Sequence, residues 1–220
     1  YQFNVTAGER FYFDYKSSTG SSYNPCWRLL DPNGQWVFGP DGFYDKEPLT
    51  LTQSGVYTLL VEGYVQATGT NNYSFNVQKV TDDQSTLTVG ETVTGSIAHA
   101  GQRDFYSFSL SAAKQLYFDA LSNSNVNWTL AGPRGTVVSG RNFTSTDSAN
   151  ISGSAIYDLV AGDYTLIIDG NGDTVGNYSF WLLDASQATA LTPGTPVTGQ
   201  LSPANETDLY QFNVTATVLF

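Results

Sequence analysis

The chain is poor in the residues on which many enzyme sites depend. Its 220 residues include one cysteine, one histidine and no methionine. Cys26 has no partner for a disulfide within the chain and no sequence context that would activate a nucleophile, so we expect a small buried thiol. His99 lies in a turn before a predicted strand, where a solvent-facing side chain is more usual than a general base. With no Gly-rich phosphate loop, CxxC pair or HExxH segment either, the sequence does not predict an enzyme.

Positive charge and long apolar runs are also scarce. Nine basic residues stand against 20 acidic ones, which gives a formal net charge of −11. Such a balance repels nucleic acid and anionic membranes, and no Lys/Arg cluster offers a phosphate footprint. No apolar stretch approaches the roughly 20 residues that span a bilayer. We therefore expect no nucleic-acid partner and no membrane insertion in this segment.

Strand-forming and turn-forming residues are abundant instead. The chain is 40% hydrophobic and 14% aromatic, with many Gly, Ser, Thr, Asn and Tyr residues. Apolar and polar residues alternate with period two, as in Tyr106, Phe108 and Leu110, which predicts strands with one buried face. Segments 31–34 and 132–135 place Pro and Gly where tight turns need them. Almost no helix is expected.

The most informative feature is a long internal repeat. Residues 1–7, Tyr-Gln-Phe-Asn-Val-Thr-Ala, return unchanged at 210–216, and a looser copy occupies 106–112. The copies begin about 105 residues apart, which is the size of a small domain rather than of a solenoid repeat. Each period should therefore contain its own core.

The repeat predicts the domain organisation. Residues 86–185 form a complete module, 1–80 form a module that lacks its first strands, and 186–220 supply the opening strands of a third. Segments 87–97 and 191–201 are matching lead-ins to the second and third copies, whereas none precedes Tyr1. We expect a window on a longer polypeptide, with a strand from elsewhere filling the open edge of the first module.

Seven or eight short strands per module predict an antiparallel β-sandwich, so the fold class is all-β with tandem modules of about 105 residues. The order of the short motifs resembles the bacterial pre-peptidase C-terminal (PPC) domain family. The resemblance covers the whole chain as one complete and two partial copies. It is carried by Thr94, Gly95, Ile97, Asp104, Tyr106, Phe108, Pro133, Gly135, Gly162, Tyr164, Leu166, Gly176, Asn177, Tyr178 and Phe180.

The resemblance implies a jelly-roll-like β-sandwich that is non-catalytic and occurs in secreted proteins, beside peptidases or in tandem arrays. Some members of the family bind matrix polymers or Ca²⁺. No peptidase segment is present in this chain, which argues against a role tied to proteolysis.

Metal binding has one local candidate. Asp169, Asn171 and Asp173 offer oxygen ligands at alternate positions, as a hard cation such as Ca²⁺ requires. The segment lacks the downstream Glu of an EF-hand loop, and an Asx-rich turn is the alternative interpretation. A second candidate is the pair Asp82 and Asp83, where an ordinary solvated hinge is the alternative. No cofactor other than Ca²⁺ is indicated.

One aromatic segment is a candidate for binding glycans or other polymers. Exposed rings beside carboxylates can stack on sugar faces and hydrogen-bond the hydroxyl groups. The alternative is that these rings cover the end of the sandwich or contact a neighbouring module. The candidate residues are Trp36, Phe38, Phe43 and Tyr44 with Asp41 and Asp45.

Asn-x-Ser/Thr sequons are frequent and would be surface acceptors in a glycosylating secretory route. The candidates are Asn72, Asn127, Asn142, Asn150, Asn177 and Asn205, and further sequons begin at Asn4 and Asn213.

Two functions remain open from the sequence. The first is a structural or adhesive part of a secreted or cell-surface stalk or fibre, whose partners are neighbouring copies or modules and which assembles head-to-tail by strand addition. The second is an accessory module of a secreted peptidase or other hydrolase that binds an extracellular polysaccharide or matrix protein. The full-length organisation would separate them.

Overall fold

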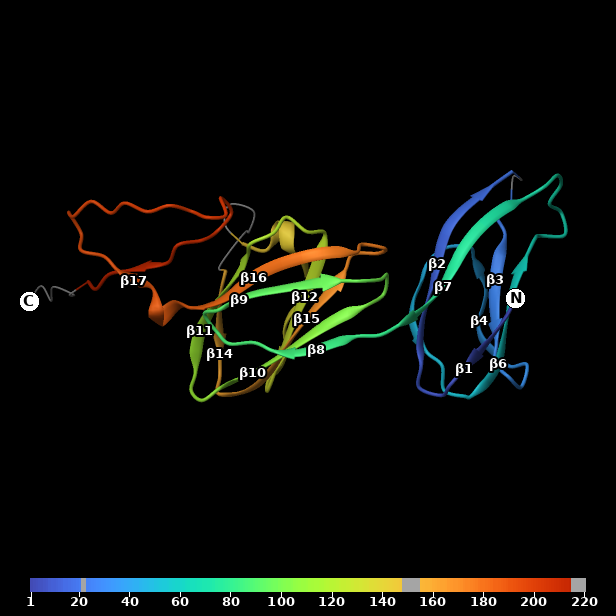
Figure 1. The fold of residues 1–220 in the computed structure, drawn as a ribbon, viewed down its shortest axis with the longest axis horizontal. Coiled ribbons are helices and arrows are strands. Elements are labelled where there is room, and N and C mark those ends of the chain that lie inside the picture. Colours follow the sequence, from blue (N-terminus) through green and yellow to red (C-terminus); the bar gives the residue numbers. More distant parts are fainter. Residues whose placement is uncertain (21–22, 148–154, 215–220) are drawn as a thin grey trace, which may run out of the picture. The chain divides into compact units, whose positions relative to one another are not determined.

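The computed structural model describes residues 1–20, 23–147 and 155–214. These residues form β-strands, with short 3₁₀ turns at Phe143–Ser145 (η1) and Ala185–Gln187 (η3), so the all-β prediction is confirmed (Figure 1). No helix in this described part has the length and apolar character needed to cross a membrane. Contacts divide the chain into two units. Unit 1 is Tyr1–Asp82 with Ala98–Gln102 and Gly172–Thr174, and unit 2 is Asp83–Ile97, Arg103–Asn171 and Val175–Phe220.

Unit 1 contains two antiparallel sheets that enclose a core. The first has the strand order β1-β6-β3-β4 and the second β5-β2-β7. The strands are β1 (Gln2–Val5), β2 (Arg10–Thr19), β3 (Cys26–Leu30), β4 (Trp36–Gly42), β5 (Lys46–Thr50), β6 (Gly55–Glu62) and β7 (Asn72–Val80).

Unit 2 repeats this plan with one more strand in each sheet. Its sheets have the orders β13-β12-β15-β10-β8 and β14-β11-β16-β9. The strands are β8 (Asp83–Thr86), β9 (Thr92–Ile97), β10 (Arg103–Leu110), β11 (Lys114–Ala120), β12 (Val126–Gly132), β13 (Gly135–Asn142), β14 (Ile156–Leu159), β15 (Gly162–Gly170) and β16 (Gly176–Asp184).

The sequence repeat identifies equivalent strands in the two units. Strand β1 corresponds to β10, β6 to β15, β2 to β11 and β7 to β16. The additional strands of unit 2, β8 and β9, have no counterpart in unit 1 among the described residues. As a result β1 and β7 each end a sheet of unit 1. The expectation that a strand from elsewhere fills this edge stays a prediction.

Each unit has an aromatic core of its own. In unit 2 the rings of Phe118 and Trp128 stack at 4.0 Å between centroids, and Phe180 stacks on the other side of Phe118 at 5.0 Å. In unit 1 the fully buried Trp27 contacts Phe43 edge-on at 4.8 Å. Burial of large rings is the main source of stability in such small sandwiches. The predicted inward aromatics thus form two separate hydrophobic clusters.

The turn motif Pro-x-Gly packs against the start of another strand. Gly162 has φ +139°, and a Cβ placed there would lie 2.4 Å from Cγ of Pro133. In unit 1 Gly55 approaches Pro32 in the same way, with φ +141°. These glycines begin β6 and β15 because only glycine fits beside the proline ring with positive φ.

The segment after β16 begins another sequence repeat. Strands β17 (Thr189–Ala190) and β18 (Tyr210–Gln211) pair in parallel, as β8 and β10 do. These parallel pairs depart from the purely antiparallel expectation. Parallel neighbours need a long connection, and residues 87–102 supply one by crossing to the other sheet as β9.

Candidate functional site

The most distinctive polar group of unit 2 is a buried pair of tyrosines. The hydroxyl oxygens of Tyr106, on β10, and Tyr178, on β16, lie 2.7 Å apart, and the Tyr178 hydroxyl donates to a carboxylate oxygen of Asp104. Burial raises the pKa of Tyr178 far above its usual value, and the bond to Asp104 raises it further. Tyr178 is therefore a neutral donor to a buried carboxylate, which is a strong type of hydrogen bond.

Strand β9 covers this pair by means of a glycine. Gly95 pairs with Tyr178 in the sheet, and a Cβ at Gly95 would lie 2.3 Å from the Tyr178 hydroxyl and 2.6 Å from that of Tyr106. No larger residue fits there without displacing the rings. The glycine in the Thr-Val-Thr-Gly sequence of β9 thus lets this strand pack directly over the two tyrosines.

Unit 1 has the same tyrosine pair without its cover. The hydroxyl oxygens of Tyr1 and Tyr73 lie 3.1 Å apart, but Tyr1 is 65% exposed and Tyr73 39% exposed, against 7% and 2% for Tyr106 and Tyr178. Phe3 and Phe75 beside them are only partly buried. We call the unpaired edges of β1 and β7 with Tyr1, Phe3, Tyr73 and Phe75 the open edge.

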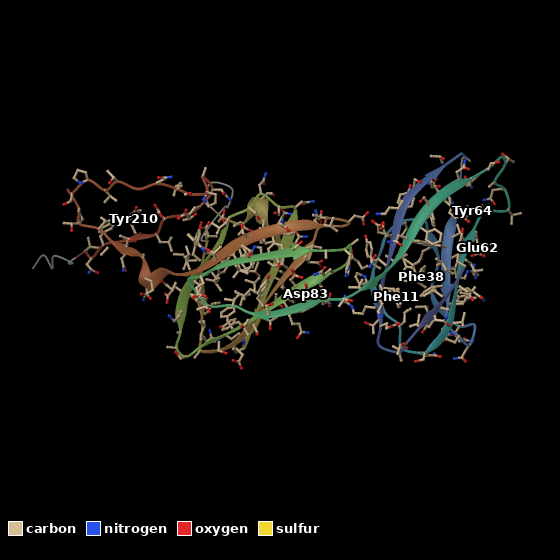
Figure 2. All side chains as sticks on the ribbon, viewed as in Figure 1. Phe11, Phe38, Glu62, Tyr64, Asp83 and Tyr210 are labelled. Atoms are coloured by element: carbon tan, nitrogen blue, oxygen red, sulfur yellow. The ribbon has the colours of Figure 1, made fainter. Side chains whose placement is uncertain are left out.

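The residues after β16 repeat this sequence pattern. Gly199 and Asp208 occupy the repeat positions of Gly95 and Asp104, and Tyr210 that of Tyr106. Val197 is 54% exposed and Leu201 47% exposed, although their counterparts Val93 and Ile97 pack on the core of unit 2. Figure 2 marks Tyr210, which begins β18.

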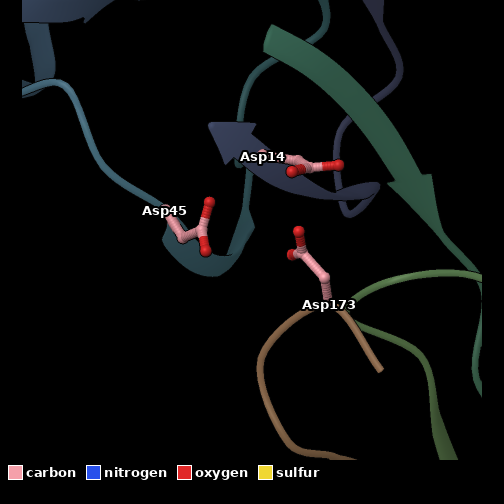
Figure 3. A group of neighbouring side chains, drawn as sticks. All are labelled: Asp14, Asp45 and Asp173. Atoms are coloured by element: carbon pink, nitrogen blue, oxygen red, sulfur yellow. The ribbon is translucent and has the colours of Figure 1, made fainter. Parts of the chain in front are cut away.

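A carboxylate group in unit 1 is a separate candidate. Asp14 on β2, Asp45 between β4 and β5, and Asp173 in the segment Gly172–Thr174 each offer an oxygen within 4.8 Å of the others (Figure 3). The Asp14 side chain is almost completely buried, and its Oδ1 has no hydrogen-bond partner. Three carboxylate oxygens at this spacing are the kind of ligand set that a hard cation takes.

Protein groups already compensate much of this negative charge. Lys16 Nζ lies 2.6 Å from Asp14 Oδ2 and 3.3 Å from Asp173 Oδ2. The Tyr12 hydroxyl donates to Asp173, and the backbone N–H of Tyr15 donates to Asp45. Burial raises the pKa of Asp14, and the bond from Lys16 opposes that rise. The geometry thus describes an ion-pair network in which a lysine occupies the position that a cation would otherwise take.

The metal ligands predicted from local sequence have different partners in the structure. Asp173 belongs to the carboxylate group just described, while Asp169 lies in β15 opposite Asn127. Asn171 donates two hydrogen bonds to Asn125, from its backbone N–H to the carbonyl oxygen and from its side-chain amide to Oδ1, as in an ordinary Asx-rich turn. Asp82 forms an ion pair with Arg10, and Asp83 begins β8.

The predicted aromatic patch is only partly exposed. Trp36 is 65% exposed and Tyr44 55% exposed, whereas Phe43 is a core residue and Phe38 packs edge-on against Phe13 at 5.1 Å. Two rings of the four are therefore available to a ligand, and the other two cover the core. Cations lie over the exposed rings: Arg28 is 4.7 Å from the centre of Trp36, and Lys46 is 4.3 Å from that of Tyr44.

The carboxylates of the patch have separate partners. Asp41 pairs with Lys46 at 2.8 Å, and Asp45 belongs to the carboxylate group with Asp14 and Asp173.

The sequon asparagines differ in how far their side chains are engaged. Asn72 and Asn177 are exposed on strands, and Asn205 is exposed but donates to the Ala120 carbonyl. The side-chain amide of Asn142 donates to Oδ1 of Asn127, and Oδ1 of Asn142 caps η1, so a glycan on the amide nitrogen of Asn142 would compete with the bond to Asn127. Asn150 lies outside the described residues.

Neither reactive residue type has catalytic surroundings. Cys26 is partly buried rather than fully buried, and its Sγ lies 3.1 Å from the hydroxyl oxygen of Tyr64. His99 is partly buried and accepts a hydrogen bond from the backbone of Thr81.

Sequence reasoning did not single out the tyrosine pair as a site. The signal was present, because the tyrosine recurs in all three copies and the Gly and Asp recur at matching positions of the second and third. The carboxylate group gave no such signal, since its members are far apart in the sequence.

Comparison with known proteins gives structural likeness alone. No family model and no curated protein matches the chain. Among solved structures, the pre-peptidase C-terminal domain of Bacillus anthracis collagenase covers 46% of this chain and 96% of its own, at 15% identity and a TM-score of 0.36. PliG of Salmonella Typhimurium, a periplasmic inhibitor of g-type lysozyme, covers 46% and 98%, at 16% identity and a TM-score of 0.35.

Proposed function

We propose that the chain is a non-catalytic tandem-repeat segment of a secreted or cell-surface stalk or fibre, with a structural or adhesive role. The observation that carries this proposal is the recurrence of one architecture. Two β-sandwich units with separate cores are followed by the opening strands of another, in the same parallel register. In repeats of this kind, reach and stability come from the number of modules.

The distribution of polar groups supports the proposal. The buried polar groups serve as internal ties, such as Tyr178 to Asp104 and Trp128 to Thr146. Cys26 and His99 have neighbours that supply no activating partner. The partners proposed from the sequence are neighbouring copies or modules. Ca²⁺ and glycans remain proposals for the acidic and sequon residues.

Surface display can be tested on the cells that make the protein. Intact cells would be treated with a protease, and an antibody against unit 2 would follow the loss of signal. Loss of the antibody signal from protease-treated intact cells supports the proposal. Protection in intact cells with loss after lysis would place the protein inside and overturn it.

A second candidate function is polymer binding by an accessory module. The observation that favours it is the exposure of Trp36 and Tyr44 beside Asp41 and Lys46. Co-sedimentation with insoluble polysaccharides would test it, using Trp36→Ala and, as a matched control, Tyr64→Ala. Tyr64 is 47% exposed and lies outside the patch. Binding that Trp36→Ala removes and Tyr64→Ala keeps would support this function.

A further inference from the structure

We propose that Asp14, Asp45 and Asp173 bind one Ca²⁺ ion, and that the Lys16 ammonium takes its place when Ca²⁺ is absent. The three carboxylates would supply the protein ligands, and water would complete a shell of about six to eight oxygens. The inference rests on the proposed function, because sites that bind Ca²⁺ at about 10⁻⁴–10⁻³ M are typical of extracellular modules.

The three carboxyl groups converge although they come from distant parts of the sequence. Asp14 lies on β2 and Asp45 between β4 and β5, and Asp173 is in a short segment that belongs to unit 1. Each offers an oxygen within 4.8 Å of the others, and Figure 3 shows the carboxyl groups of Asp14 and Asp173 facing each other. Like charges at this distance repel, so the fold requires a positive group among them.

One oxygen of the Asp14 carboxylate is buried without a protein donor. Asp14 is 2% exposed, and its Oδ1 has no hydrogen-bond partner among the described residues. A buried carboxylate oxygen in this state is costly, because it has lost water and gained no hydrogen bond in return. Burial accordingly raises the pKa of Asp14. A cation bound at this carboxylate would offset the cost.

The pair of carboxylates belongs to the repeat, because it recurs in unit 2. Asp119 occupies the repeat position of Asp14, is fully buried and also has an Oδ1 without a hydrogen-bond partner in the described part of the chain. In each unit the next residue donates its backbone N–H to a second aspartate, Asp45 in unit 1 and Asp147 in unit 2. Among the described residues, only unit 1 adds a third carboxylate, that of Asp173.

Lys16 has the properties of an exchangeable counter-ion. Its Nζ lies 2.6 Å from Asp14 Oδ2 and 3.3 Å from Asp173 Oδ2, but its side chain is 47% exposed. A strongly hydrated ammonium on a flexible stem can turn into solvent when a divalent ion enters. One ammonium among three carboxylates also leaves two negative charges, which is the charge that Ca²⁺ would balance.

The site is accessible, and its ligands suit Ca²⁺ better than Mg²⁺. Asp45 and Asp173 are exposed, so a cation can reach them from solvent and keep part of its water shell. Ligands on separate connecting segments can adjust their positions. Such a set fits the irregular coordination of Ca²⁺, whereas Mg²⁺ demands a near-ideal octahedron.

Isothermal titration calorimetry of the 220-residue chain with CaCl₂, in buffer freed of divalent ions, tests the proposal. Wild type should bind one Ca²⁺ with a Kd of about 10⁻⁴–10⁻³ M. Asp45→Asn removes one ligand charge at an exposed position and should weaken binding about tenfold. Glu47→Gln removes the same charge from an exposed residue outside the carboxylate group and should bind like wild type.

This matched pair separates a built site from general attraction. A chain with a formal net charge of −11 draws cations to its whole surface, and both variants reduce that charge equally. Asp14→Asn should weaken binding as Asp45→Asn does. Because the Asp14 side chain is buried, the exposed Asp45 keeps the test independent of any effect on folding.

Lys16→Gln tests the exchange of counter-ions. The variant removes the competing ammonium and should bind Ca²⁺ several-fold more tightly than wild type. Circular dichroism before the titration would show that the variant is folded. Unchanged or weaker binding would mean that Lys16 is a permanent partner of the carboxylates and would overturn the inference.

A wild-type chain that takes up no Ca²⁺ at about 10⁻² M would also overturn the inference, as would equal affinities of Asp45→Asn and Glu47→Gln. None of these results would affect surface display, which protease treatment of intact cells measures separately. Conversely, a chain that binds Ca²⁺ but is protected inside cells would overturn the proposed function and leave the cation site intact.

Discussion

The backbone N–H of Thr207 donates to Oδ2 of Asp119 at 3.0 Å and so fastens the segment after β16 to strand β11. The Tyr117 hydroxyl meets the Thr207 hydroxyl at 3.2 Å beside it. Asp119 is fully buried, and its other oxygen has no hydrogen-bond partner. Burial raises the pKa of Asp119 to about 6, although the bond from Thr207 opposes the rise.

This pKa predicts that part of the stability of unit 2 falls as pH rises. Because the folded pKa lies above the unfolded value of 3.8, the folded state holds the proton more tightly. The contribution is present below pH 3.8 and is lost as pH rises through about 6. Asp119→Asn should therefore stabilise unit 2 at pH 7 by roughly 1–3 kcal/mol, with a smaller gain near pH 4.

Urea unfolding at both pH values would measure this effect. Asp158→Asn, at an exposed aspartate on β14, is the control and should change little at either pH. A loss of stability in Asp119→Asn at pH 7 would show that the charged carboxylate stabilises the fold.

Loss of a core ring should affect one unit at a time. Trp128→Ala removes the ring that stacks on Phe118, and we expect unit 2 to lose about 3–5 kcal/mol. Trp27→Ala should do the same to unit 1. Because the two rings lie in separate clusters, each variant should shift one of two thermal transitions in calorimetry. A shift of both transitions in either variant would mean that the cores unfold together.

Removal of the Lys16 charge should destabilise unit 1 in a pH-dependent way. Lys16→Gln leaves the buried Asp14 with less compensation, and the pKa of Asp14 is already raised by burial. Since Lys16 is partly exposed, we expect a loss of about 1 kcal/mol near pH 8. A raised carboxyl pKa favours the folded state at low pH, so the loss should be smaller at pH 5.

Thermal unfolding of Lys16→Gln at the two pH values provides the measurement. Lys79→Gln removes a more exposed lysine that pairs with Glu9 and serves as the control. Equal losses of stability in the two variants would show that the carboxylate group makes Lys16 no more important than the exposed Lys79.

Local patterns predicted much of the fold. The alternation of Tyr106, Phe108 and Leu110 identified one buried strand face, and all three residues are in the core. The Pro-x-Gly turns were also found, because their backbone requirements are local. The parallel pairing of β8 could not be predicted, since the strand is short and its residues are polar and exposed.

The sites were harder to predict for the same physical reason. Asp14, Asp45 and Asp173 meet only through tertiary folding, so no spacing rule reveals them. Phe43 resembles its exposed neighbour Tyr44 in the sequence, and only the packing against Trp27 shows that it is buried. The open edge could be inferred from the repeat, whereas its tyrosine hydroxyl pair required the structure.

The close fit of Gly95 over the hydroxyl groups of Tyr106 and Tyr178 limits how the repeat can vary. A residue with a Cβ at this position would meet both hydroxyl groups, so the glycine and the two tyrosines can be replaced only together.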